Sequence, residues 1–189
     1  MRLFLCVFFL VAINNVAHAQ SHARIVTSLG TIKIRFLAKD APKTVDNFVK
    51  LAKGEQRFVD TEGKKAMRPF YNGQIVHRVT PKLGIFMGCQ WGTGRGWPGY
   101  YIFDENVDGS SFDRPGLVAM SKLSPKDNRF GSQFFITTAA DDRLNKKYTI
   151  FAEVESGMDI VEKISRVPAD TMMKPKTPVK ITAVEIISQ

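Results

Sequence analysis

Two stretches of the chain set isolated polar side chains among β-branched and aromatic residues: FGSQFFI at residues 130–136 and FYNGQIVHRV at residues 70–79. Runs of Val, Ile, Phe and Tyr bounded by turn residues are typical of β-strands. Within them, Gln133 precedes two phenylalanines and Arg78 stands between valines. A polar group in such a strand is either satisfied by a buried partner or exposed where it is used. The two stretches therefore predict a β-rich fold and supply the first candidate functional residues.

The segments on either side of these two stretches predict two helices and a β-hairpin. Residues 24–28 and 31–36 flank a Leu-Gly pair, and the second run alternates apolar and charged side chains, which predicts a β-hairpin. A helix with one apolar stripe is predicted from Asp40, which can cap it, to Gly54, which can end it. A second helix is predicted to begin at Ser156.

The remaining chain predicts antiparallel strands. Residues 70–151 hold short apolar runs between glycine-rich loops, and residues 179–187 form a β-branched final run. An order of strand, helix, several strands, helix and strand fits a closed β-barrel with helices over its ends. Closure would leave no exposed strand edge.

The N-terminal residues have the three parts of a secretory signal peptide. Arg2 supplies a positive charge, residues 3–13 are apolar, and AHA at residues 17–19 is a small-x-small cleavage site. The alternative is an uncleaved membrane anchor, although the apolar run is short against the roughly 20 residues that a span needs. We expect residues 1–19 to be removed, the protein to reach the periplasm or the exterior, and no stable membrane insertion.

The net charge bears on which partners the protein can bind, and the cysteine count bears on whether it can form a disulfide. The chain has 27 Lys and Arg against 18 Asp and Glu, and removal of Arg2 leaves a net charge of +8. The basic residues are scattered, so we interpret the charge as a surface property and expect no nucleic-acid partner. Cys89 becomes the single cysteine after cleavage, so no internal disulfide can form, and we expect it to be buried.

The sequence gives little support for metal binding, for a serine-hydrolase active site or for dinucleotide binding. His22 and His77 are the histidines of the mature chain, and neither has a partner at zinc-ligand spacing, so we expect no metal. No G-x-S-x-G elbow of a hydrolase is present. GRGWPG at residues 94–99 matches the dinucleotide pattern G-x-G-x-x-G, but the Trp-Pro pair disfavours the helix that this pattern must open. A tight surface loop is expected there.

Taken together, the FYNG and HRV motifs, GSQFFI, Phe151 and Gly157-Met158 resemble the cyclophilin family, over about residues 24–187. The run CQWGTG at residues 89–94 is similar to its bacterial exported members. The resemblance implies one domain over residues 20–189, an eight-stranded closed barrel capped by two helices, and peptidyl-prolyl cis-trans isomerase activity. It also implies a monomer that acts on proline-containing polypeptides without a cofactor.

The resemblance implies roles for individual residues. Arg78 matches the catalytic arginine, and Gln133 matches the glutamine that positions the substrate backbone. Phe135 and Leu144 match the proline pocket. Tyr148 stands where many members have histidine, and we expect it to be tolerated at the pocket edge.

The segment after Arg78 departs from the family pattern. In an ungapped register Leu83 replaces the pocket phenylalanine, Gly84 the methionine and Phe86 a substrate-binding glutamine. A shifted register, which needs an insertion, makes Phe86 and Met87 the pocket pair. The ungapped register implies a shallower pocket without that glutamine.

Two further differences concern substrate choice. The loop at residues 120–125 is longer than in the family, and Lys122 within it is expected to favour substrates with acidic flanks. Arg143 replaces a tryptophan of some members, which removes apolar pocket area and is expected to weaken cyclosporin-like ligands.

Three hypotheses of function follow. The first is an exported prolyl isomerase that assists the folding of exported proteins. The second is a catalytically weak cyclophilin scaffold that binds proline peptides or a partner, as a chaperone does, and the missing glutamine and Arg143 motivate it. The third is a basic nucleic-acid or lipid-surface binder, which salt-dependent binding indifferent to proline would indicate.

Overall fold

The structure is a computed structural model that describes residues 20–122, 124 and 126–188, so the predicted signal peptide lies outside the described residues. The predicted hairpin, helices and final strand are all present within this order of elements: β1 (Gln20–Thr27), β2 (Gly30–Phe36), α1 (Pro42–Lys53), β3 (Phe58–Val59), β4 (Lys65–Ala66), β5 (Arg78–Thr80), β6 (Gly84–Met87), β7 (Ile102–Phe103), β8 (Leu117–Met120), β9 (Arg129–Phe130), β10 (Phe134–Thr137), a 3-10 helix (Asp142–Leu144), β11 (Ile150–Ser156), α2 (Met158–Ser165) and β12 (Ile181–Ser188).

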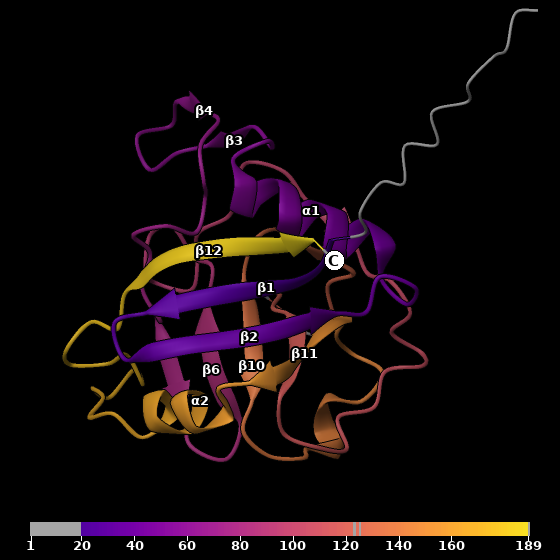
Figure 1. Ribbon diagram of the computed structural model, residues 1–189, viewed down its shortest axis with the longest axis vertical. Coiled ribbons are helices and arrows are strands. Elements are labelled where there is room, and N and C mark those ends of the chain that lie inside the picture. Colours follow the sequence, from indigo (N-terminus) through magenta and orange to yellow (C-terminus); the bar gives the residue numbers. More distant parts are fainter. Residues whose placement is uncertain (1–19, 123, 125, 189) are drawn as a thin grey trace, which may run out of the picture.

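Eight strands form one antiparallel sheet in the order β12-β1-β2-β11-β8-β10-β6-β5. Figure 1 shows β12, β1 and β2 in front of β6 and β10, with α1 and α2 on opposite sides. The fold is therefore mainly β with two helices, as predicted.

The predicted closure of the barrel is only partial. Among the described residues, no strand ladder joins β5 to β12. The two edges meet through an isolated bridge between Ile75 and Lys180 and through hydrogen bonds such as that from Val76 N–H to the Val179 carbonyl, at 2.9 Å. These contacts come from residues 73–76, which precede β5, rather than from β5 itself.

The two ends of α1 differ in how well the sequence predicts them. Gly54 ends the helix in the left-handed conformation (φ 78°), as expected. Asp40 does not cap it, because the cap position is Ala41, whose side chain makes no such bond. The Glu105 carboxylate instead accepts a hydrogen bond from Thr44 N–H at 2.7 Å. A carboxylate there satisfies free N–H groups and favours the helix dipole.

An aromatic core fills the interior of the sheet. The Phe48 ring of α1 lies 5.0 Å from Tyr71, 5.4 Å from Phe134 and 5.3 Å from Phe151, measured between ring centroids. Cys89 is buried, as expected. Within the part of the chain that the structure describes, no helix combines the length and apolar content needed to cross a membrane.

Candidate active site

A cleft of about 660 Å³ lies beside β5 and β6 and contains four of the predicted site residues: Arg78, Phe86, Lys122 and Gln133. The other residues that line it come from two loops and from the ends of strands: His77, Gly92, Thr93, Gly94, Arg95, Ser121, Asp170, Met172 and Lys174. The candidate catalytic arginine is therefore at a concave surface.

Strand alternation builds an apolar cluster beside this cleft. Successive side chains of a strand point to opposite faces, so Phe134 and Ile136 join the interior core while Phe135 points outward. Phe135 is paired with Phe86 of β6 and with Ala119 of β8. The outer aromatic cluster formed in this way consists of Phe86, Phe112, Leu117, Ala119 and Phe135, with Leu83, Leu144, Tyr148 and Ile150 packed against it.

The predicted pocket residues Phe135, Leu144 and Tyr148 thus come together in the outer aromatic cluster. Phe135 is its floor, because the ring is only 2% exposed. Its centroid lies 5.2 Å from Phe86 and 5.4 Å from Tyr148. The accessible apolar surface is therefore provided by the partly buried Leu144, Tyr148 and Leu83.

The structure separates Met87 from the other candidate residues of this segment. Leu83 and Phe86 pack on the outer aromatic cluster, whereas Met87 is fully buried in the interior core. Neighbouring residues of β6 face opposite sides of the sheet, so Phe86 and Met87 cannot both face substrate. We therefore do not assign Met87 to the substrate site.

The side chain of Arg78 is exposed and held from two sides. Its guanidinium carbon lies 4.5 Å from the centroid of the Phe86 ring. Its Nε–H donates to the Thr80 hydroxyl at 3.3 Å, and that hydroxyl donates to the Met173 sulfur at 3.4 Å. No carboxylate of the described residues forms an ion pair with Arg78, so its remaining N–H groups are available to a ligand.

Replacing Phe86 by leucine is expected to lower kcat/KM about two- to fivefold, because the cation–π contact that holds the Arg78 guanidinium is worth roughly 0.5–1 kcal/mol at an exposed site. Leucine retains most of the apolar volume. A Phe86→Tyr variant, which keeps a ring, is the matched control and should retain activity. Equal activity of the leucine and wild-type proteins would show that the ring does not position Arg78.

Gln133 is engaged with the loop across the cleft. Its amide nitrogen donates to the carbonyls of Gly94 and Gly96 at 3.0 and 2.6 Å. An amide NH₂ has two donors, so only the side-chain oxygen is left to contact a substrate. Gln133 therefore fixes one wall of the cleft.

Lys122 differs from the expectation of a free charge. Its ammonium bonds to the Asp104 carboxylate at 2.7 Å, its side chain is 3% exposed, and it lies 5.4 Å from the centroid of Tyr148. The ion pair neutralises the charge, so Lys122 holds the loop against the outer aromatic cluster and is a poor receptor for acidic flanks.

Arg143 also turns away from the pocket. Its side chain is 86% exposed, and its Nε and Nη2 donate to the two carboxylate oxygens of Asp141, each at 2.8 Å. The apolar cover that a tryptophan would supply is absent at this position.

His77 is buried beside Arg78 and is uncharged at neutral pH. Burial lowers its pKa from 6.5 to about 4, and the positive charges of Arg78 and Lys174 contribute to the decrease. Its Nδ1 has no hydrogen-bond partner among the described residues. Burial raises the pKa of Tyr148, and the Arg78 charge opposes this increase, which indicates that Arg78 and Tyr148 lie near one another.

The His77 pKa predicts a loss of stability in acid. Between about pH 6.5 and pH 4 the unfolded chain binds a proton at His77 that the folded chain does not, so stability falls as pH falls through this window. The loss is about 2–3 kcal/mol. We expect urea unfolding at pH 7 and pH 4.5 to show a smaller pH dependence for His77→Gln than for wild type. Equal pH dependence would contradict the buried neutral state.

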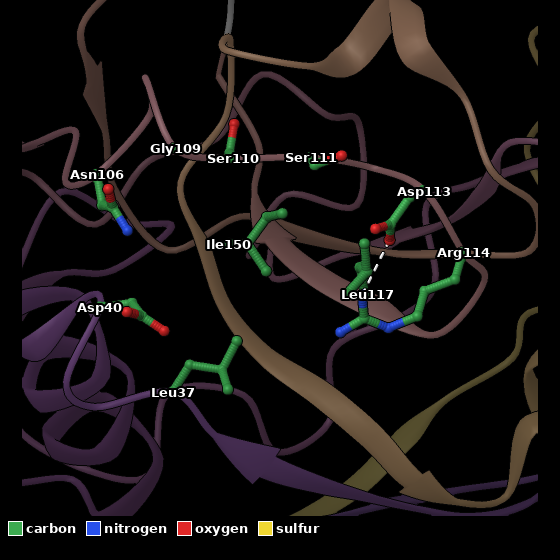
Figure 2. A pocket seen from close by; sticks show the side chains of 10 residues that line it. All are labelled: Leu37, Asp40, Asn106, Gly109, Ser110, Ser111, Asp113, Arg114, Leu117 and Ile150. Carbon is green, nitrogen blue, oxygen red and sulfur yellow. Dashed lines mark hydrogen bonds and ion pairs between the residues drawn. The ribbon is translucent and has the colours of Figure 1, made fainter.

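A second cavity, of about 210 Å³, lies between the chain before α1 and residues 106–114 (Figure 2). Two of its three charged lining residues are paired with each other: Arg114 donates to Asp113 at 2.9 Å, and also to Glu153 at 3.0 Å, whereas Asp40 forms no ion pair with another described residue. Its lining includes no predicted site residue. No group of three His, Cys, Asp or Glu suited to a metal occurs in the described part of the chain.

Comparisons with known proteins agree with this geometry. Residues 22–186 match the family described as cyclophilin type peptidyl-prolyl cis-trans isomerase/CLD. The chain is 39% identical to peptidyl-prolyl cis-trans isomerase A of Mycobacterium tuberculosis, over 93% of this chain and 97% of the relative. It is 41% identical to peptidyl-prolyl cis-trans isomerase B of Streptomyces anulatus, over 80% of this chain and 87% of that one.

Solved structures support the same assignment. A cyclophilin type peptidyl-prolyl cis-trans isomerase of Cryptosporidium parvum superimposes with a TM-score of 0.78 at 28% identity, covering 89% of this chain and 98% of that one. A second structure of it, in the presence of the dipeptide Ala-Pro, gives 0.75 at 30% identity, covering 89% and 99%. The fold and cleft thus define a β-sheet protein of the prolyl isomerase class. The chain belongs to the cyclophilin-type peptidyl-prolyl cis-trans isomerase family, and its relatives support this enzymatic activity.

Nine of the thirteen residues that line the cleft were not predicted as site residues, and they include Arg95, Asp170, Met172 and Lys174. Arg95 lies in the glycine-rich loop at residues 94–99. The other three lie in the turn after α2, which is attached to β5 by the hydrogen bond from Val79 N–H to the Met173 carbonyl, at 2.8 Å. No local pattern marks them, because only the tertiary fold brings both loops to Arg78.

Proposed function

We propose that the protein is an exported isomerase that accelerates X-Pro rotation in folding polypeptides, with Arg78 as its catalytic residue. The observation that carries this proposal is the exposed Arg78 guanidinium, which lines the cleft, lies over the Phe86 ring and forms no ion pair with a carboxylate of the described residues.

The chemistry of the peptide bond explains why an arginine suits this reaction. Delocalisation of the nitrogen lone pair into the carbonyl gives a rotation barrier of roughly 18–20 kcal/mol. At the twisted transition state this lone pair returns to the proline nitrogen. An N–H of Arg78 can then donate a hydrogen bond that is weaker in the planar ground state. Such differential stabilisation is the requirement for catalysis.

Proline-containing peptides are the proposed ligands. The Cryptosporidium parvum relative was solved in the presence of Ala-Pro, which supports a site for proline here. The proline ring would lie against Leu83, Leu144 and Tyr148, and the oxygen of Gln133 would accept a backbone N–H. Binding of this kind needs no cofactor and no second subunit.

Export is proposed from residues 1–19. Slow X-Pro rotation limits folding on a scale of tens of seconds, so an exported isomerase would serve proteins that fold after translocation. Export can be tested by expressing the full-length protein in a bacterium with two membranes. Cell fractionation then locates the protein, and mass spectrometry identifies its N-terminus. A mature N-terminus at Gln20 in the periplasm or medium supports export. An intact N-terminus in the cytoplasm or membrane contradicts it.

A binding module is the second candidate, and the coverage of Phe135 by Phe86 and Tyr148 favours it. A proline ring could reach the floor of the cluster only if one of these side chains moved. Isomerisation of a short X-Pro peptide, measured by NMR exchange with the purified protein, separates the two candidates. Acceleration supports the enzyme, whereas peptide binding without acceleration supports the binding module.

A further inference from the structure

Positive charges without partners gather around the cleft. Arg78 and Arg95 are exposed, and Lys174 is half-buried. All three line the cleft, and none forms an ion pair with another described residue. Many basic side chains elsewhere are paired, as Lys33 is with Glu155 at 2.5 Å. The cleft therefore brings together three cations that have no ion-pair partner among the described residues.

The other ionisable groups of the cleft do not cancel these charges. Lys122 is neutralised by Asp104. His77 is uncharged at neutral pH. Asp170 is the one carboxylate among the lining residues, and its Oδ1 accepts hydrogen bonds from the backbone N–H groups of Met172 and Lys174, at 2.8 and 2.9 Å. It thereby shapes its own turn, and the cleft keeps an excess of positive charge.

The two outer cations come from separate loops. Arg95 belongs to the loop whose carbonyls at Gly94 and Gly96 are held by Gln133. Lys174 belongs to the turn that is bonded to β5. One loop is thus bonded to Gln133, directly before β10, and the other to β5, which carries Arg78, so a substrate held at these two residues would pass close to both cations.

We propose that Arg95 and Lys174 make the cleft select substrates that carry an acidic side chain within a few residues of the proline. This inference rests on the proposed isomerase function and names its substrate class. A carboxylate on the substrate would find two cations that form no ion pair with another described residue. Because the cations are accessible to solvent, each contact is worth up to about fivefold in affinity and weakens with salt.

The test uses matched peptides and an assay without a coupling protease. One peptide series places Glu, Gln or Lys two residues before the proline, and a second series places them directly after it. NMR exchange gives kcat/KM, and titration of the same samples gives the dissociation constant. In at least one series we expect the Glu peptide to exceed the Gln peptide by about three- to tenfold at low salt, and the Lys peptide to be poorest.

Charge-removing variants locate the effect. Each single change, Arg95→Ser or Lys174→Ser, should lower the Glu-to-Gln ratio, and the double change should bring it to about one. The matched control is Lys39→Ser, since Lys39 is exposed, has no ion pair among the described residues and does not line the cleft. This control removes a positive charge elsewhere and should keep the ratio.

Equal values for the Glu and Gln peptides in both series would overturn the proposal. So would a ratio that the double variant keeps, or one that Lys39→Ser removes as well, since overall charge would then explain it. Tighter binding of the Glu peptide without acceleration of any peptide would support the selectivity while contradicting the isomerase function. The two failures are thus distinguishable.

Discussion

Replacing Arg78 by alanine is expected to lower kcat/KM for X-Pro isomerisation by about ten- to a hundredfold. A charge-assisted hydrogen bond to the proline nitrogen stabilises the transition state by up to about 3 kcal/mol, and each factor of ten in rate needs about 1.4 kcal/mol. The side chain is exposed and forms no ion pair with another described residue, so the free energy of unfolding should change by less than about 1 kcal/mol. NMR exchange of a short X-Pro peptide and urea unfolding measure the two quantities.

An Arg78→Lys variant is the control for charge alone. Lysine keeps the positive charge but lacks the planar fork that stacks on Phe86 and donates in a fixed direction. We expect its activity to lie between those of the wild-type and alanine proteins. An alanine variant with activity within twofold of wild type would exclude Arg78 as the catalytic residue.

Replacing Phe135 by alanine is expected to reduce the free energy of unfolding by about 3–5 kcal/mol, the usual effect of removing a buried phenylalanine. The ring is 2% exposed and contacts the rings of Phe86, Phe112 and Tyr148 at centroid distances of 5.2, 5.9 and 5.4 Å. The cavity would also remove the floor beneath the proposed proline site. The Michaelis constant should therefore rise in the part of the population that remains folded.

The matched variant for this position is Phe135→Leu, which keeps most of the volume but not the ring stacking. It should be less destabilised than the alanine protein by 1 kcal/mol or more. Urea denaturation at pH 7 compares the three proteins. A loss of less than 1 kcal/mol for alanine would show that this cluster is loosely packed and that Phe135 is not its structural floor.

Local sequence patterns were sufficient for much of the fold. Alternating apolar residues at 31–36 predicted the second strand of the hairpin, and Gly54 predicted the end of α1. Capping of α1 could not be predicted, because Glu105 lies about sixty positions along the chain from the helix start. Barrel closure was overestimated, because the pairing of the strand edges becomes evident only in the folded chain.

For some of the predicted site residues the local sequence pattern was enough to predict their place in the site, and for others it was not. Arg78 and Gln133 stand in strand-like runs, and both line the cleft. For Phe86 and Met87 two registers were open from the sequence, and the structure places their side chains in different hydrophobic clusters. The charge of Lys122 was visible in the sequence, but its neutralisation by Asp104 depends on a contact between separate loops.

The sequence by itself determined the β-rich class, the two helices and the motifs that resemble cyclophilins, because hydrophobic periodicity and turn residues act over short distances along the chain. The tertiary structure alone decided which face of the sheet carries the outer aromatic cluster, which cations remain unpaired and which loops border the cleft. These features depend on the pairing of β5, β6, β8 and β10 and on loops that are far apart in sequence. Electrostatic environment and burial arise from such long-range contacts, so they follow from the folded chain rather than from any local pattern.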